Sequence, residues 1–359
     1  MGKIEIYNYN LIKNDIENLY KIFKDLMNEK DNSVLIMGWF QYFILISIEA
    51  SNYFDGSIKF KYKKVLENCR ARLKPMEIEY DKMQQKMEEL NAEKMKEFRG
   101  YVKDGFKTIL SGFITNYGVY KVNGEIIGNT FLSETIYKKI IYENGKISKT
   151  KIINVSREIG ATLNDLMSVM GLSKNYKGES RNINIEDKDY NVFKRNCKLF
   201  KRGINTNDGL ILLNSLSLIN FYIYIIATMN VNKELKYRLG YIIFDNTYQN
   251  SLKILEKINK NILTKIINKY EFLINREFRN CMFHYDISKT IEENEIRDEM
   301  YIGIISKCLN ISDKEYIKFI DQYMDEMSNI IKDSILSKVK PKSWTIYIIL
   351  QIWNDFCIK

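Results

Sequence analysis

Only two prolines, Pro75 and Pro341, interrupt the 359 residues of this chain. Proline lacks a backbone donor and breaks helices, so its scarcity leaves long stretches in which a helix meets no obligatory break. Tracts rich in Ile, Leu, Lys, Glu and Asn fill these stretches, with apolar residues at helical spacing. The sequence therefore predicts a mainly α protein.

The first region, residues 1–112, contains three stretches of helical character. Residues 10–30 carry apolar positions three and four apart, residues 34–48 are a nearly continuous apolar run, and residues 75–99 are dense in charge of both signs. The first pattern is typical of an amphipathic helix and the second of a buried one. The third favours a solvated helix with one packed edge, although its approximate heptads leave a short coiled coil open. We expect an N-terminal helical region.

Two Asn-Gly pairs mark a change of character between residues 113 and 155. Asn123-Gly124 and Asn144-Gly145 are both flanked by β-branched or aromatic residues. Asn-Gly readily adopts the positive φ angles of a two-residue hairpin turn, so each pair predicts a β-hairpin. We interpret 113–155 as a small β insertion.

Residues 156–205 are interpreted as a basic, polar connector. A short helix is expected at Thr162–Met170, and basic and aromatic residues are interleaved after it. Basic groups neutralise phosphates and aromatic rings stack on unpaired bases, so this segment is a candidate surface for the approach of RNA. A solvated linker between domains explains the same pattern at least equally well.

The remaining region, residues 206–359, is predicted to be a helical bundle. Apolar residues at helical spacing, separated by brief polar breaks, mark four segments at 208–230, 233–260, 261–282 and 297–338. Antiparallel helices with short connections pack as a bundle. A last helix is expected at 344–353, after Pro341, where it would pack back on the body.

Two uncharged stretches, 33–48 and 209–228, raise the question of a membrane span. Only the second has the length of about 20 residues that crosses a bilayer. It contains Asn214 and Asn220, which are costly in lipid but ordinary on one edge of a buried helix. We expect both stretches to be core helices, with no stable membrane insertion.

The composition limits cofactors and partners. The net charge of +10 permits a polyanionic partner such as RNA without requiring one. The single histidine excludes a multi-histidine metal centre within one chain, and the five cysteines include no C-x-x-C pair. The sequence also has no Gly-rich phosphate loop. We expect no metal, no cofactor and, with no signal peptide evident, a cytoplasmic location.

The groups that reaction chemistry needs concentrate at Arg279, Asn280 and His284, the only histidine. Cleavage of RNA without a metal requires deprotonation of the 2′-hydroxyl, stabilisation of the phosphorane charge and protonation of the leaving 5′-oxygen. An imidazole can perform the first or the last task, a guanidinium the second, and a carboxamide can orient either. The alternative is a histidine at a helix end that packs or hydrogen-bonds without chemistry.

The order Arg279-Asn280, three residues, His284 resembles the signature of the HEPN superfamily of small helical ribonucleases. The resemblance covers this motif and, more loosely, the helical segment 205–338. It implies a HEPN-like bundle, a metal-independent endoribonuclease acting by 2′-hydroxyl attack, and a homodimer whose composite active site joins two motifs. It also implies a toxin or an abortive-infection effector in anti-phage defence, and leaves room for a regulatory or antitoxin partner.

Secondary candidates for substrate contacts flank the motif at Arg276, Tyr285 and Asp286. On one continuous helix Asn280 and His284 share a face and Arg279 lies well round from His284, a geometry more easily completed across a two-fold axis. The alternative function is a non-catalytic nucleic-acid-binding or regulatory protein of the same superfamily. In that case Arg279 and His284 support the fold or bind nucleic acid.

Overall fold

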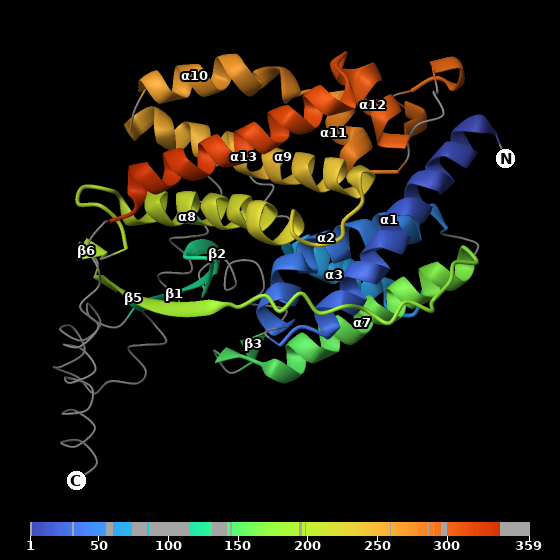
Figure 1. Ribbon diagram of the computed structural model, residues 1–359, viewed down its shortest axis with the longest axis horizontal. Coiled ribbons are helices and arrows are strands. Elements are labelled where there is room, and N and C mark those ends of the chain that lie inside the picture. Colours follow the sequence, from blue (N-terminus) through green and yellow to red (C-terminus); the bar gives the residue numbers. More distant parts are fainter. Residues whose placement is uncertain are drawn as a thin grey trace, which may run out of the picture.

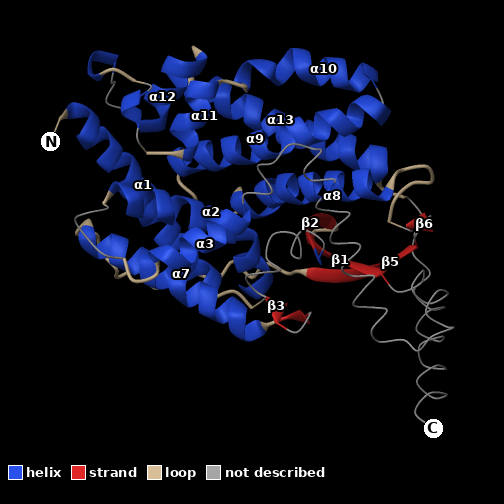
Figure 2. Ribbon diagram, turned by 180° about the vertical axis from the view of Figure 1, so that it is seen from behind, coloured by secondary structure: helices blue, strands red, loops and turns tan. Residues whose placement is uncertain are grey.

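The computed structural model describes residues 2–30, 32–54, 60–73, 85, 115–130, 142–143, 146–193, 196–197, 199–258, 260–285, 287–289, 291–295 and 300–337. These residues are mostly helical with a small antiparallel sheet, which confirms the predicted mainly α class (Figure 2). The helices expected at 75–99 and 344–353 lie outside the described residues, apart from Gln85.

Helices of the C-terminal part pack on one another as a bundle, formed by α8 (Thr206–Phe221), α9 (Lys233–Ile258), α10 (Lys260–Tyr270) and α13 (Asp313–Ile335). Helix α9 contacts the other three, and α13 lies along α8 and α9 (Figure 1). Aromatic rings fill the space between them. The ring centroids of Phe244 on α9 and Tyr323 on α13 are 4.8 Å apart in an edge-to-face arrangement. Such pairs add directional contacts to the burial of apolar area.

Two of the predicted helices are each divided by a cap. Helix α11 (Arg276–Phe283) begins separately after α10, because the side chain of Asn275 accepts the N–H of Phe278 at 2.9 Å. Helix α12 (Met300–Leu309) is likewise separate from α13, which starts at Ser312 with a capping box to Glu315. Asn and Ser side chains bind the first unpaired N–H groups of a helix, so each residue starts a new one.

The N-terminal helices share the core of the bundle. Helix α1 (Lys3–Met27) packs against α2 (Asn32–Tyr53) and also contacts α9 and α12. Helix α3 (Lys63–Leu73) packs on α2. One cluster of buried side chains contains residues from all four regions distinguished in the sequence. These regions therefore fold together around a common core.

Helix α7 (Lys149–Val169) begins earlier than the sequence predicts. The helix expected at Thr162–Met170 is its C-terminal part, and its first turns occupy residues assigned to the β insertion. Ser148 starts it by accepting the N–H of Lys151 at 3.3 Å. The β-branched residues Ile152 and Val155 have strand propensity, but here they are buried in the core that α7 shares with α1 and α2. Tertiary packing overrides the local preference.

The sheet contains the predicted hairpin. Strands β1 (Thr115–Val122) and β2 (Glu125–Asn129) pair across Asn123 and Gly124, whose φ angles are 54° and 81°. These are the positive angles that an Asn-Gly turn supplies. Strands β3 (Tyr142–Glu143) and β4 (Lys146–Ile147) also pair, while the second Asn-Gly turn between them lies outside the described residues.

A further strand comes from the segment interpreted as a connector. Strand β5 (Glu186–Phe193) pairs with β1, and β6 (Asn196–Cys197) pairs with β5, so the sheet order is β2-β1-β5-β6. Strand β5 opens with the charged run from Glu186 to Asp189, which disfavours strand structure locally. Pairing with the neighbouring strands β1 and β6, rather than local propensity, makes this segment a strand.

The two apolar stretches are packed inside the protein. Ser33–Tyr53 and Thr206–Ile226 are long and apolar enough to cross a membrane, but 72% and 89% of their most apolar windows are buried among other elements. Polar residues of α8 bond within the core. Asn220 donates to the carbonyl of Ile126 at 2.9 Å, and Ser328 of α13 donates to Asn220 at 2.7 Å. Burial in the core accounts for the apolar character of both helices.

Candidate functional site

The candidate motif lies on the short helix α11 and at its end. Helix α11 stops at Phe283, and His284 has an extended backbone with φ −125° and ψ 156°. The N–H of His284 still donates to the carbonyl of Asn280 at 2.9 Å. Because His284 stands just outside the helix, the expectation that it shares a helical face with Asn280 does not describe its imidazole.

The imidazole of His284 meets a carboxylate from the N-terminal part of the chain. Its Nδ1 lies 2.9 Å from Oε2 of Glu49 on α2. The His284 side chain is 48% exposed and that of Glu49 only 10%. Arg70 on α3 donates to the other oxygen of Glu49. A half-exposed imidazole is thus backed by a largely buried ion pair.

Glu49 is ionised at neutral pH. Burial alone raises the pKa of its carboxyl, but the hydrogen bond to His284 and the charge of Arg70 outweigh burial and hold the pKa below its ordinary value. A carboxylate can only accept hydrogen bonds, so Nδ1 of His284 carries the proton of this contact. In the neutral imidazole the unprotonated nitrogen is then Nε2, which is the atom able to take a proton from a substrate.

Arg279 is paired with a different carboxylate. Its Nε donates to Oδ2 of Asp245 on α9 at 2.9 Å, with side-chain exposures of 39% and 15%. The guanidinium carbon lies 4.7 Å from the centroid of the Phe283 ring. Burial raises the pKa of Asp245, and Arg279 offsets this rise only in part. Two contacts inside the chain therefore fix the direction of the Arg279 side chain.

The other sequence candidates occupy different environments. Asn280 and Arg276 are exposed on α11, where solutes can reach them. Tyr285 is 2% exposed and its hydroxyl donates to Asp15 at 2.9 Å, so it faces the core and offers no surface for substrate. Asp286 lies outside the described residues. In the basic connector, Phe200 is buried and presents no open ring for stacking on a base, whereas Tyr176 is partly exposed and its hydroxyl donates to Asp25 at 2.7 Å.

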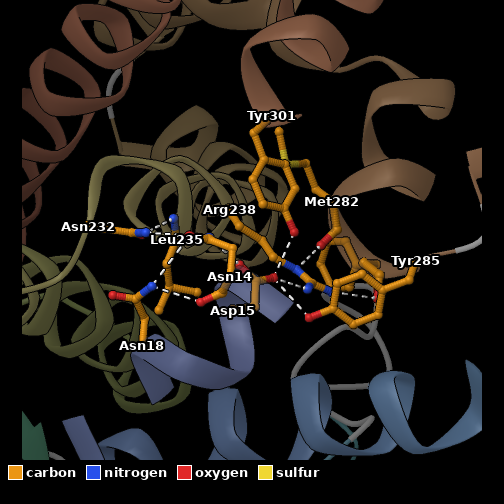
Figure 3. Close-up of polar contacts among 10 residues, drawn as sticks. Asn14, Asp15, Asn18, Asn232, Leu235, Arg238, Met282, Tyr285 and Tyr301 are labelled. Carbon is orange, nitrogen blue, oxygen red and sulfur yellow. Dashed lines mark hydrogen bonds and ion pairs between the residues drawn. The ribbon is translucent and has the colours of Figure 1, made fainter. Parts of the chain in front are cut away.

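A buried polar cluster, here called the Asp15 cluster, is formed by Asp15, Arg238, Tyr285 and Tyr301 (Figure 3). Oδ2 of Asp15 on α1 accepts three hydrogen bonds, from Arg238 at 2.6 Å, Tyr285 at 2.9 Å and Tyr301 at 2.8 Å. Burial raises the pKa of both tyrosines, which keeps their hydroxyls protonated as donors. The cluster joins α1, α9 and α12 to the residue after the motif histidine.

Arg238 also holds the end of α11. Its Nε donates to the carbonyl of Met282 at 2.7 Å, and a terminal nitrogen donates to the carbonyl of Phe283 at 3.3 Å. The last carbonyls of a helix have no partner within that helix, and a cation is favoured at this end. Arg238 supplies both the donors and the charge. The Asp15 cluster therefore fixes the point at which the chain leaves α11 and presents His284.

Sequence reasoning missed Glu49, Arg70, Asp245 and Arg238. One signal could have identified Glu49, because it is the only charged residue between Ser33 and Phe54. A single carboxylate at the end of an apolar helix needs a partner when it is buried. The sequence offers no comparable signal for Arg70, whose pairing depends on how α2 and α3 meet.

Among the described residues, no group of three or more His, Cys, Asp or Glu side chains is arranged to hold a metal ion. Comparison of the chain with protein-family models, with curated proteins and with solved structures finds no match.

Proposed function

We propose that this chain is a metal-independent endoribonuclease of HEPN type that cleaves RNA by attack of the 2′-hydroxyl on the adjacent phosphodiester. One observation carries the proposal: the only imidazole of the chain is half exposed and hydrogen-bonded through Nδ1 to the ionised, largely buried Glu49. This arrangement orients the ring and leaves Nε2 for proton transfer.

Each residue of the site has a role in this chemistry. His284 takes the proton of the 2′-hydroxyl or gives one to the leaving 5′-oxygen, and Glu49 stabilises the imidazolium formed on the way. Arg279 offers its guanidinium to the phosphorane, where charge-assisted hydrogen bonds are strong. Asn280 orients the substrate from the exposed face of α11. The products are a 2′,3′-cyclic phosphate and a free 5′-hydroxyl.

The decisive experiment incubates the purified full chain with end-labelled single-stranded RNA in EDTA. We expect cleavage that survives the chelator, ends in a cyclic phosphate, and spares the same RNA with 2′-O-methyl groups. His284→Ala is expected to lower the rate by about 10²- to 10⁴-fold, the usual contribution of one acid–base group, with an unchanged melting temperature. Equal loss of RNA with the variant would identify a contaminating nuclease and refute the catalytic role.

Two further variants separate orientation from proton transfer. Glu49→Gln keeps the shape of the side chain but removes its charge, so the rate should fall by less than with His284→Ala. Tyr248→Phe serves as a control, because this buried tyrosine lies on α9 and takes no part in the site. Its rate should equal that of the unmodified chain.

The resemblance to HEPN ribonucleases also leads us to propose a homodimer with a composite active site. Two copies would provide one imidazole as base and one as acid. Mixing the intact chain with an excess of His284→Ala tests this, because a mixed dimer holds only one imidazole. A rate per intact chain that falls as mixed dimers replace intact dimers supports a site shared between copies, whereas a rate per intact chain that is unchanged, in a preparation that sediments as mixed dimers, argues against it.

A second function has support from a specific observation. Both Arg279 and His284 have acidic partners within the chain, Asp245 and Glu49, as residues with a purely structural role would. On this alternative the chain is a non-catalytic nucleic-acid-binding or regulatory protein. RNA binding that is unchanged by His284→Ala, in the absence of cleavage by either protein, would favour it.

The biological role follows the enzymatic proposal. An RNA-cleaving protein of this kind would act in the cytoplasm as a toxin or in anti-phage defence by abortive infection. A regulatory or antitoxin partner would then restrain it. Expression in a bacterial host tests this role, because growth should stop with the intact chain and continue with His284→Ala.

A further inference from the structure

Two cysteines meet where α11 packs against α12. Cys281 lies two residues after Arg279 on α11, and Cys308 lies in the last turn of α12. Neither is in a disulfide, and the thiol of Cys281 is hydrogen-bonded to the sulfur of Cys308. Cys281 is 2% exposed, whereas Cys308 is only partly buried. Cys308 is therefore the more accessible residue of the pair.

The two helices hold the thiols in register. The side-chain amide of Asn275, the cap of α11, donates to the backbone carbonyl of Cys308 at 3.0 Å. The start of α11 is thus bonded to the end of α12, and the helices pack directly on each other. Because the two thiols share a hydrogen bond, their sulfurs lie close to each other, which is the first requirement for a disulfide.

The surroundings favour the thiolate of Cys308. The hydrogen bond from Cys281 lowers the pKa of the Cys308 thiol, and Lys307 lowers it further. Burial and the carboxylates of Glu277 and Glu295 oppose this, but the pKa remains below its ordinary value. The thiolate is the nucleophile in thiol oxidation, so Cys308 is the residue expected to react first.

We propose that Cys281 and Cys308 form a redox-sensitive pair that a hydroperoxide converts to an intramolecular disulfide linking α11 to α12. This modification site does not depend on the proposed nuclease activity. It lies within the motif, since Cys281 stands between Arg279 and His284.

The reaction proceeds in two balanced steps. The Cys308 thiolate attacks one oxygen of the hydroperoxide, the O–O bond breaks, and the sulfur becomes a sulfenic acid while water or an alcohol leaves with a proton. The Cys281 sulfur then attacks the sulfenic sulfur, the S–S bond forms, and the hydroxyl leaves as water with the thiol proton. Two thiols lose two electrons and the hydroperoxide gains them.

Peptide mapping of the full chain tests the proposal without any variant. The reduced protein is treated with stoichiometric hydrogen peroxide, its remaining thiols are alkylated, and its peptides are identified by mass spectrometry. We expect one cross-linked species joining the peptides of Cys281 and Cys308, lighter by two hydrogen atoms and restored by dithiothreitol. A sulfinic acid at Cys308 beside an alkylated Cys281 would overturn the proposal, as would a disulfide to another cysteine.

Matched variants sharpen the result. Cys308→Ser should leave Cys281 reduced, because the thiol of Cys281 is buried and peroxide does not react with it directly. Cys281→Ser should let Cys308 proceed to the sulfinic acid, and Cys69→Ser, at a buried cysteine on α3, should leave the cross-link unchanged. The oxidised protein should also melt at a higher temperature than the reduced one, because the bond closes a loop in the unfolded chain. Oxidation of Cys281 in Cys308→Ser at the rate of the unmodified chain would contradict the assigned order.

Discussion

Two arginine–aspartate pairs in this protein have the same chemistry but differ in burial. Arg238 and Asp15 are 2.6 Å apart with both side chains fully buried, whereas Arg279 and Asp245 are 2.9 Å apart with Arg279 at 39% exposure. A buried charge deprived of its partner has no water to replace it, but an exposed one does. Burial therefore assigns the first pair to the stability of the fold and leaves the second available for contact with a ligand.

Breaking the buried pair should have the largest effect. Asp15→Ala leaves the guanidinium of Arg238 and two tyrosine hydroxyls without their acceptor, so we expect the free energy of unfolding to fall by about 3–5 kcal/mol. Urea denaturation at pH 7 measures this loss. The double variant Asp15→Leu with Arg238→Met should be more stable than Asp15→Ala, because no buried charge is left unpaired. A loss below about 1 kcal/mol for Asp15→Ala would remove the distinction between the pairs.

Removing one donor of the Asp15 cluster should have an intermediate effect. Tyr301→Phe deletes a 2.8 Å hydrogen bond to a buried carboxylate, a bond worth about 1.5–3 kcal/mol. Tyr248→Phe is the matched control, because its buried hydroxyl has no hydrogen-bond partner among the described residues. Denaturation midpoints should therefore fall for Tyr301→Phe and stay level or rise for Tyr248→Phe. Equal losses would mean that the lost hydroxyl volume matters more than the bond.

Breaking the half-exposed pair should cost less stability than breaking the buried one. Arg279→Ala should lower the free energy of unfolding by less than Asp15→Ala does, because Arg279 is partly exposed and Asp245, although largely buried, already has a raised pKa and can take up a proton when its partner is removed. The same variant should abolish RNA cleavage if Arg279 stabilises the phosphorane. Urea denaturation and the RNA assay on one preparation measure both effects. A large loss of stability would instead place Arg279 with Arg238 as part of the structural core.

Ionisation of Glu49 and ionisation of Asp245 should change the stability of the fold in opposite directions. The pKa of Glu49 is lower in the folded protein than its ordinary 4.5, so its contribution to stability is present above pH 4.5 and is lost as the pH falls through the folded value. The pKa of Asp245 is raised above its ordinary 3.8, so ionisation of Asp245 reduces stability as the pH rises through that range. Melting temperatures between pH 3 and pH 7 should show a weaker acid dependence in Glu49→Gln. An acid limb identical to that of the unmodified chain would contradict the assignment.

Local sequence patterns predicted many of the helices and strands but few of the contacts between distant segments. The Asn123-Gly124 hairpin and the core helices α2 and α8 followed from turn chemistry and apolar runs, which act within a few residues. Strand β5 and the early start of α7 did not, because pairing with β1 and packing in the core decide them against local propensity. The motif identified His284, but its contact with Glu49, and the pairing of Glu49 with Arg70, arise where α2 and α3 meet the end of α11. No local sequence pattern predicts contacts between segments so far apart in the chain.

The Asp15 cluster has a consequence for the order of events at the ribosome. Asp15 and Arg238 are separated by 223 positions, so at roughly 5–20 residues per second the acid leaves the exit tunnel about 10–45 s before its counter-ion. Helix α1 cannot settle in its final surroundings during that interval. Nascent chains arrested before residue 238 should remain sensitive to protease along α1, and completion of synthesis should protect it.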